Sequence, residues 1–151
     1  MTIEDAIKSS GTMTITTKTV INLMYTCRII EEEMMNALKP FDLSMQQYNV
    51  LRILRGQKGK PANLSTLQER MIDRSSNTTR LVDKLLRKEL VHRSICKVNR
   101  RKVEIRITNK GLELLEKLDP ITEGNNKKVV GKLSNKQLET LNKTLDTLRT
   151  F

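Results

Sequence analysis

The spacing of apolar residues changes abruptly in one region, and this change constrains the fold most. Between residues 102 and 108, KVEIRIT, apolar and charged residues alternate strictly, which predicts a half-buried β-strand. Residues 91–97, VHRSICK, favour a second strand, and the basic segment 98–101 between them predicts a hairpin tip. A two-stranded ribbon that follows helices is the order found in a helix-turn-helix with a wing.

Helical spacing precedes this ribbon. Apolar residues recur at helical intervals, and Pro40 is a natural stop for the longest of these stretches. Ser44 with Gln47 has the spacing of a capping box, which satisfies free amides in the first turn of a helix. Thr2 with Asp5 is a variant of that box. The helices expected before residue 72 span residues 2–9, 18–39, 44–56 and 64–71.

The stretch from residue 73 to residue 88, DRSSNTTRLVDKLLRK, predicts an amphipathic helix that Asp73 or Ser75 caps. Its polar front is short and carries Arg80, which suits insertion into the major groove of DNA. Taken alone, the stretch is also typical of an ordinary surface helix. The apolar side holds Thr78, Leu81, Val82, Leu85 and Leu86, and the polar side holds Ser76, Arg80, Asp83 and Arg87.

The positive charge of the chain is concentrated around this stretch. Residues 44–108 hold 16 Lys or Arg against 5 Asp or Glu, so the whole net charge of +11 lies there. Such a distribution indicates a polyanion-binding module between neutral elements. With only 3% aromatic residues, the chain lacks the stacking platforms of single-strand binders.

Two further helices are expected after the ribbon. Thr108 is a candidate cap for the first, in which Pro120 predicts a kink or a break. Ser134 with Gln137 forms another capping box and opens the second. The last helix carries a seam of leucines, which predicts pairing with a second copy, or alternatively packing within the chain. The seam consists of Leu138, Leu141, Leu145 and Leu148.

Two segments together resemble the MarR family of bacterial winged helix-turn-helix regulators. They are residues 67–93, with IDRSSNTTRLVDKLLRKELVHR, and residues 99–111, NRRKVEIRITNKG, where the family has D-x-R, alternating apolar residues and L-T-x-x-G. Two positions depart from the pattern. Glu89 stands where the family usually has glycine, so the exit of the preceding helix is expected to differ. Asn99 replaces the aspartate that orients the wing arginine, Arg101.

The resemblance implies a mainly α (α+β) fold: a winged helix-turn-helix with a two-stranded β-wing, flanked by N- and C-terminal dimerisation helices. Its divisions would be residues 1–43, 44–108 and 109–151, in one compact chain that forms an intertwined dimer. The implied function is a sequence-specific regulator that binds a palindromic double-stranded DNA operator as a homodimer. It would be a repressor that a small aromatic effector releases.

By the same resemblance, the DNA contacts come from the helix that follows residue 72 and from the wing. Asn and Arg can make bidentate contacts with bases, whereas Ser, Thr and Lys more often bind phosphate. The expected contact residues are Ser75, Ser76, Asn77, Thr79, Arg80, Lys84, Arg100 and Arg101, and the weaker candidates are Arg74, Lys102 and Arg106.

Several side chains have competing interpretations. Met24, Met34 and Met35 are candidates for an effector pocket, although plain core packing explains a methionine as well. Cys27 and Cys96 raise the alternative of a redox-sensing regulator, although a free cysteine is commonly a small core residue. The basic surface also fits a winged-helix module that binds an acidic protein.

Other classes of protein have little support. We expect no enzyme, because no activated nucleophile, paired carboxylates or phosphate-binding glycine loop is recognisable. No metal site or cofactor is expected, since the chain has one histidine and no cysteine pair with ligand spacing. The acidic N-terminus is unlike a signal peptide, and no apolar run reaches membrane-spanning length, so a cytoplasmic protein without membrane contact is expected.

Overall fold

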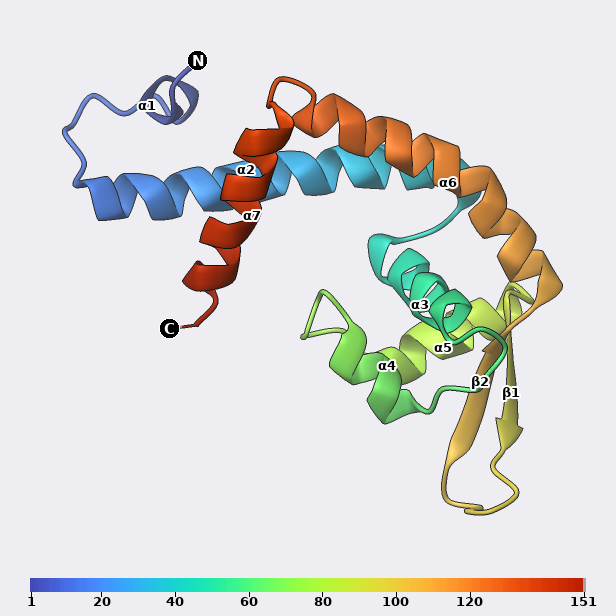
Figure 1. Cartoon of the computed structure of the whole chain (residues 1–151). Coiled ribbons are helices and arrows are strands. Elements are labelled where there is room, and N and C mark those ends of the chain that lie inside the picture. The colour runs from blue at the N-terminus through green and yellow to red at the C-terminus, as the bar shows by residue number, and fades with distance from the viewer. Residues whose placement is uncertain (151) are drawn as a thin grey trace.

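The computed structural model describes residues 1–150, and its helices and strands form two layers (Figure 1). Long terminal helices make the upper layer, in which α2 and α6 lie side by side. Residues 44–108, which we call the basic module, lie below them. The predicted mainly α fold with a two-stranded wing is confirmed. The elements are α1 (Ile3–Ala6), α2 (Ile15–Leu38), the 3-10 helix η1 (Lys39–Phe41), α3 (Met45–Gly56), α4 (Leu64–Arg70), α5 (Thr78–Arg87), β1 (Val91–Ile95), β2 (Val103–Ile107), α6 (Asn109–Val130) and α7 (Asn135–Leu148).

The predicted capping boxes are present at the starts of α1, α3 and α7. In each, the first side chain accepts a hydrogen bond from the backbone amide three residues on, and the side chain there accepts one from the cap backbone. Thr108 caps α6 as expected, accepting from the Gly111 amide at 3.1 Å. These local hydrogen bonds explain why the sequence located these helix starts correctly.

The core of the basic module lies where α3, α5 and β2 meet the first half of α6. Fully buried leucine, isoleucine and valine side chains fill it, as the low aromatic content requires. Ala62, between α3 and α4, pairs with Ile105 through two backbone hydrogen bonds of 2.8 and 2.9 Å and so ties the loop to the ribbon. The most buried members are Val50, Leu51, Leu54, Leu67, Val82, Leu85, Ile105, Leu115 and Leu118.

One residue joins the ribbon to the upper layer. Thr108 lies between β2 and α6, and its amide donates to the Leu90 carbonyl at 3.1 Å. Its hydroxyl donates to the Glu89 carbonyl at 2.8 Å. Just beyond it, a Cβ on Gly111 would lie 2.5 Å from the Leu90 carbonyl oxygen, so only glycine fits this close approach.

Polar contacts fix the basic module to α6. Arg55 of α3 donates two hydrogen bonds to the Asp119 carboxylate, at 2.7 and 2.9 Å. These bonds hold the pKa of Asp119 below its usual value. Deeper in the interface, the Tyr48 hydroxyl donates to the Thr122 hydroxyl at 3.2 Å, and both residues are buried. The orientation of the module relative to α6 is therefore set by directional bonds as well as apolar packing.

Three expectations about helices need correction. The helix expected from residue 73 begins only at Thr78, because the side chain of Asn77 caps it and residues 73–76 form a turn. The long helix expected from residue 18 begins at Ile15, where Thr14 caps it. Of the kink or break expected at Pro120, the break is absent: α6 continues through the proline and curves along its length (Figure 1).

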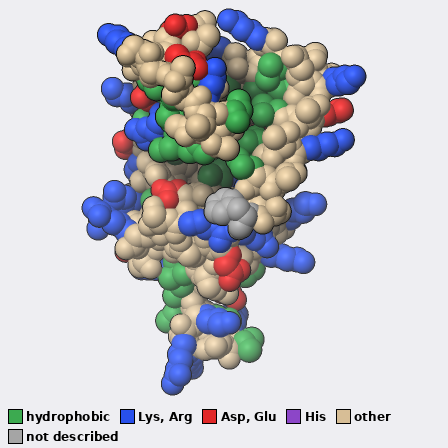
Figure 2. Space-filling model, turned by 90° about the vertical axis from the view of Figure 1, so that its left-hand side faces the viewer, with side chains coloured by type: hydrophobic (Ala, Val, Ile, Leu, Met, Phe, Trp, Pro, Cys, Tyr) green, Lys and Arg blue, Asp and Glu red, His purple; other side chains and the backbone are tan. Residues whose placement is uncertain are grey.

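The terminal helices leave apolar side chains exposed. Among the described residues, α7 buries none, and two of its seam leucines, Leu141 and Leu148, are more than 40% exposed. On α2, Ile15, Val20 and Met24 are also exposed. Figure 2 shows green apolar side chains lining a hollow at the level of the terminal helices. The other two seam leucines, Leu138 and Leu145, are half-buried, so packing within the chain leaves part of the seam uncovered.

The exit of α5 keeps the left-handed conformation despite the missing glycine, so the expectation of a different exit is also wrong. Glu89 has φ 60°, its amide donates to the Leu86 carbonyl at 2.9 Å, and the Leu90 amide donates to the Leu85 carbonyl at 3.0 Å. This is a Schellman arrangement. Contacts to the Glu89 carbonyl and carboxylate, the latter 3.3 Å from Lys110, accompany it.

We expect Glu89→Gly to raise the free energy of unfolding by about 0.5–1 kcal/mol, because glycine adopts positive φ without a steric penalty. Urea unfolding followed by circular dichroism measures the change. The control is Arg87→Gly, two residues earlier and still in ordinary helical geometry, which should lower stability by up to ~1 kcal/mol. Destabilisation by both substitutions would show that the left-handed residue is not strained.

Candidate nucleic-acid interface

The predicted contact residues gather around the turn that precedes α5. This turn and the first two turns of α5 border a shallow hollow of about 330 Å³. Arg80 and Lys84 lie four residues apart, so their side chains project from one face of the helix. The hollow is lined by Gln46, Asp73, Ser75, Ser76, Asn77, Arg80, Leu81 and Lys84.

The turn is held from both sides by side chains of neighbouring helices. From α3, Asn49 accepts a hydrogen bond from the Ile72 amide at 2.9 Å, and Gln46 donates to the Asp73 carboxylate at 3.2 Å. From α4, Gln68 donates to the Arg74 carbonyl at 3.0 Å. The turn thus has a fixed shape before any partner binds.

Asp73 organises the turn from within. Its carboxylate accepts hydrogen bonds from the Ser75 amide at 3.0 Å and the Ser75 hydroxyl at 2.6 Å. The bond from the Ser75 hydroxyl, followed by those from Gln46 and from the Ser75 amide, lowers the pKa of Asp73 below its ordinary value of 3.8. Asp73 is therefore the centre of the turn and not the cap of α5.

Some of the expected contact residues in and after this turn are exposed, and others are already hydrogen-bonded within the chain or buried. Arg74, Thr79, Arg80 and Lys84 are exposed. The Asn77 side-chain oxygen accepts from the Arg80 amide at 3.0 Å as the helix cap, which leaves its amide nitrogen for a partner. The Ser75 hydroxyl is bonded to Asp73. The Ser76 hydroxyl oxygen is buried and has no hydrogen-bond partner in the described part of the chain.

The wing carries its cations at an ordered tip. Arg100, Arg101 and Lys102 are exposed there. The Asn99 side-chain oxygen accepts from the Arg101 backbone amide at 3.1 Å, and the Asn99 carbonyl accepts from Lys102 at 2.9 Å. Asn99 therefore fixes the backbone of the tip, and its amide does not hold the Arg101 guanidinium.

Other basic side chains of the module serve as braces. Arg106 donates to the Gly59 carbonyl at 2.9 Å and lies 3.5 Å from the Glu104 carboxylate. Arg93 of β1 donates to Asp83 of α5 at 2.8 Å, which joins the wing to the helix. Sequence reasoning missed Arg93 and the three amide side chains that hold the turn. The only sequence signal for the three amide side chains is that each is a polar residue next to the apolar face of a helix.

The three methionines do not share a pocket. Met24 is 66% exposed on α2, and Met34 packs against the core. Met35 lines an open hollow of about 540 Å³ together with Lys84, Lys88 and other residues. Their role as effector contacts remains a prediction.

The two cysteines lie on separate elements. Cys27 is exposed on α2, with its sulfur 3.9 Å from a Glu31 carboxylate oxygen. Cys96 is half-buried, directly after β1. Both thiols are free. Within residues 1–150, no group of three or more histidine, cysteine, aspartate or glutamate residues could hold a metal ion.

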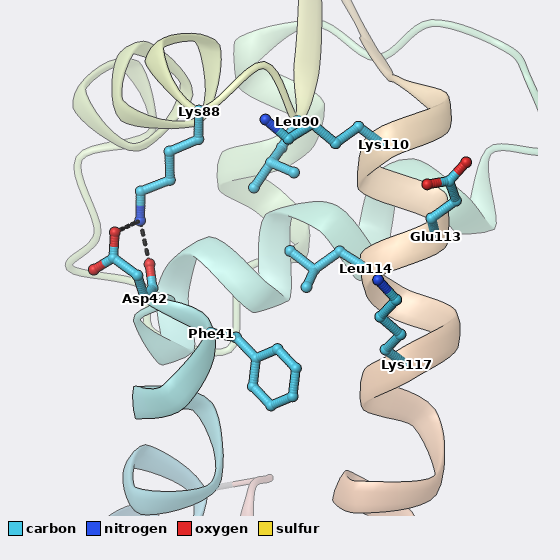
Figure 3. A pocket seen from close by; sticks show the side chains of 8 residues that line it. All are labelled: Phe41, Asp42, Lys88, Leu90, Lys110, Glu113, Leu114 and Lys117. Atoms are coloured by element: carbon cyan, nitrogen blue, oxygen red, sulfur yellow. Dashed lines mark hydrogen bonds and ion pairs between the residues drawn. The ribbon is translucent and has the colours of Figure 1, made fainter.

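A third hollow, of about 400 Å³, lies between η1, the segment just before β1, and α6 (Figure 3). Phe41 borders it on one side, and Leu114 and Lys117 of α6 border it on the other. Lys88 bonds to the Asp42 carbonyl and lies 3.3 Å from the Asp42 carboxylate. The hollow combines apolar walls with three lysines. Its lining is completed by Leu90, Lys110 and Glu113.

Comparison with known proteins agrees with this architecture. A sequence model of the MarR family matches residues 43–103. A search of curated proteins finds no match. In the described part of the chain, no helix is long and apolar enough to cross a membrane.

Solved structures match over most of the chain. A MarR transcription factor from Planctomyces limnophilus is 28% identical, with a TM-score of 0.71 over 91% of this chain and 99% of that one. A MarR-like transcription regulator from Bacillus cereus ATCC 10987 is 21% identical, with a TM-score of 0.79 over 89% and 95%. BpsR from Bordetella bronchiseptica, whose DNA binding is regulated by 6-hydroxynicotinic acid, is 20% identical, with a TM-score of 0.80 over 93% and 99%.

We expect Asp73→Ala to speed hydrogen exchange of the Ser75 amide severalfold at pH 7, because that amide loses its acceptor. The folded pKa of Asp73 is lowered, so the wild-type bond is complete above pH 3.8 and is lost only as the pH falls through that lower pKa. Amide exchange followed by NMR measures this. Asp83→Ala, which removes only the pair with Arg93, should leave Ser75 unchanged; equal rates in wild type and Asp73→Ala would refute the anchoring role.

Proposed function

We propose that this chain, which belongs to the MarR family, regulates transcription by binding a palindromic double-stranded DNA operator as a homodimer. α5 would enter the major groove, and the wing would reach the minor groove or the backbone. The observation that carries this proposal is a set of cations that form no ion pair within the described part of the chain, some around the rigid turn before α5 and others at the wing tip. Among the described residues, none of the ion pairs involves Arg74, Arg80, Lys84, Arg100 or Arg101, whereas Arg93 and Arg106 are paired.

Uncommitted cations favour a polyanion, because binding it sacrifices no internal ion pair and releases counterions from the phosphates. The Arg80 guanidinium and the Asn77 amide nitrogen stand at the start of α5, where a recognition helix meets base edges. Lys84, one turn further on, is in position for a phosphate. This combination of a reading helix and flanking cations favours DNA over an acidic protein.

The exposed apolar faces of the terminal helices support dimerisation. Exposed leucines on α7 and apolar residues on α2 would be costly in an isolated chain, and a second copy would cover them. A twofold dimer presents two copies of α5 to one face of DNA. Its operator would accordingly be a palindrome with half-sites about one helical turn apart.

Selection of bound sequences from random duplex DNA tests the proposal directly. The expected result is an enriched palindrome with half-site centres about 10 base pairs apart. Recovery of unrelated sequences would contradict sequence-specific binding. It would leave the alternative use of a basic winged module, contact with an acidic protein, as the better account.

We expect Arg101→Ala to weaken binding to the selected operator by about 1–3 kcal/mol without lowering the unfolding temperature, because the side chain is exposed at the wing tip. Gel-shift titration at fixed salt measures the affinity. Arg101→Lys keeps the charge and should recover part of the loss, so it separates the lost charge from the lost side-chain contacts. Unchanged affinity in Arg101→Ala would remove the wing from the interface.

We further propose that the protein is a repressor released by a small aromatic anion. The hollow between η1 and α6 supports this, because Phe41 and Leu114 offer apolar contacts and Lys117 has no ion-pair partner among residues 1–150. Its position between the terminal helices and the basic module suits an effect on DNA binding. The regulation of BpsR by 6-hydroxynicotinic acid makes that compound the natural first probe.

In a gel shift with the selected operator, 6-hydroxynicotinate and related aromatic carboxylates should lower the affinity of the wild type. Lys117→Ala should keep DNA binding and lose most of this response, because an anion loses its uncommitted cation. Lys132→Ala is the matched control on a remote surface. A response that is equal in Lys117→Ala and wild type would exclude this hollow as the effector site.

A further inference from the structure

Ile72 is one of the large apolar residues that the basic module leaves exposed, and the others, Ile95 and Val98, belong to the wing. It lies in the turn between α4 and α5 and is 88% exposed, while the preceding residue, Met71, is 3% exposed. The expected DNA contacts begin two residues further on, at Arg74. An isoleucine held in water forgoes roughly 1.5–3 kcal/mol of possible burial, so its position calls for a physical explanation.

The backbone around Ile72 is too well anchored for this exposure to reflect a loose loop. Met71 is fixed in the core, and the Ile72 amide is bonded to Asn49 at 2.9 Å. Asp73 is bonded to Gln46, and the Arg74 carbonyl to Gln68. Four consecutive residues are therefore tied to α3, α4 or the core. The Ile72 side chain is presented outward from a fixed backbone, which lowers the entropic cost of any contact that it makes.

The surroundings of Ile72 select the kind of partner. Asp73 follows it, with its carboxylate engaged by Gln46 and Ser75, and the next residue, Arg74, is exposed. Arg80 and Lys84 project from the helix that the turn leads into. An acceptable partner must therefore be polyanionic and yet offer an apolar group. In the DNA major groove the thymine C5-methyl is the apolar group that base pairs present.

We propose that Ile72 reads thymine, by packing against the C5-methyl group of one thymine in each half-site. This inference rests on the proposed function, since it requires α5 to lie in the major groove. It adds a specificity contact outside the polar set of the helix. Hydrogen bonds from Arg80 and Asn77 would read donors and acceptors, and Ile72 would distinguish thymine from cytosine at one further position.

The test combines a protein substitution with removal of a single methyl group from the DNA. In the selected operator, each thymine is replaced in turn by deoxyuridine, which pairs identically and lacks only the methyl. For the wild type, one symmetric position should lose about fourfold in affinity per half-site, the effect of burying one methyl group. Ile72→Ala should bind the thymine operator more weakly and should not distinguish thymine from uracil at that position.

Controls separate this contact from a general loss of binding. Val98→Ala removes an apolar side chain that is 97% exposed at the wing tip, and it should discriminate thymine from uracil as the wild type does. Thermal unfolding of Ile72→Ala should match the wild type, because the side chain is exposed. Ile72→Val, which keeps a branched apolar surface, should retain part of the discrimination.

The outcomes distinguish this inference from the proposed function. If random-sequence selection recovers no operator, the proposed function fails, and the inference fails with it. If an operator is recovered and Ile72→Ala responds to every uracil substitution as the wild type does, the inference alone is overturned. An operator without thymine in its half-sites would overturn it as well. Loss of the thymine preference at one position in Ile72→Ala alone supports it.

Discussion

Burial of one face of α5 is the interaction on which the rest of the basic module depends. Val82 and Leu85 are fully buried against a core that includes α3, β2 and α6. Because residues three and four apart share a face, this burial leaves Arg80 and Lys84 outside. Leu90 and Val91 continue the apolar anchor into the ribbon and are also buried. The position of the wing relative to α5 thus follows from the same core.

Polar side chains then fix the exact shape of the turn before α5 and of the ribbon, which the core holds in place. The turn before α5 takes its shape from amide side chains of α3 and α4, and the ribbon is braced by the pairs Arg93–Asp83 and Arg106–Glu104. Exposed ion pairs contribute little stability individually. Their effect here is geometric, because each commits one cation to a brace and leaves others unpaired beside it. The surface therefore separates structural cations from those offered to a partner.

The parts of the fold that depend on local chemistry could be predicted from the sequence. Capping boxes at Thr2, Ser44 and Ser134 and the alternation in β2 involve neighbours within a few residues, so spacing alone reveals them. The start of α5 could not be predicted in this way. The segment DRSSNTT offers several possible caps, and the choice of Asn77 accompanies the fixing of Asp73 by Gln46, which is 27 residues away in sequence. Glu89 illustrates the same limit, since tertiary contacts outweigh its conformational preference.

Thr108 makes the connection between the wing and α6 very short. A single residue separates the last residue of β2 from the first of α6, and its amide and hydroxyl hold the chain just beyond α5. A linker this short and this fully bonded cannot absorb displacement. If α6 tilts, the start of the wing and the end of α5 must therefore move with it. The distance between α5 and the wing is consequently stiff, while the placement of the pair as a whole follows the terminal helices.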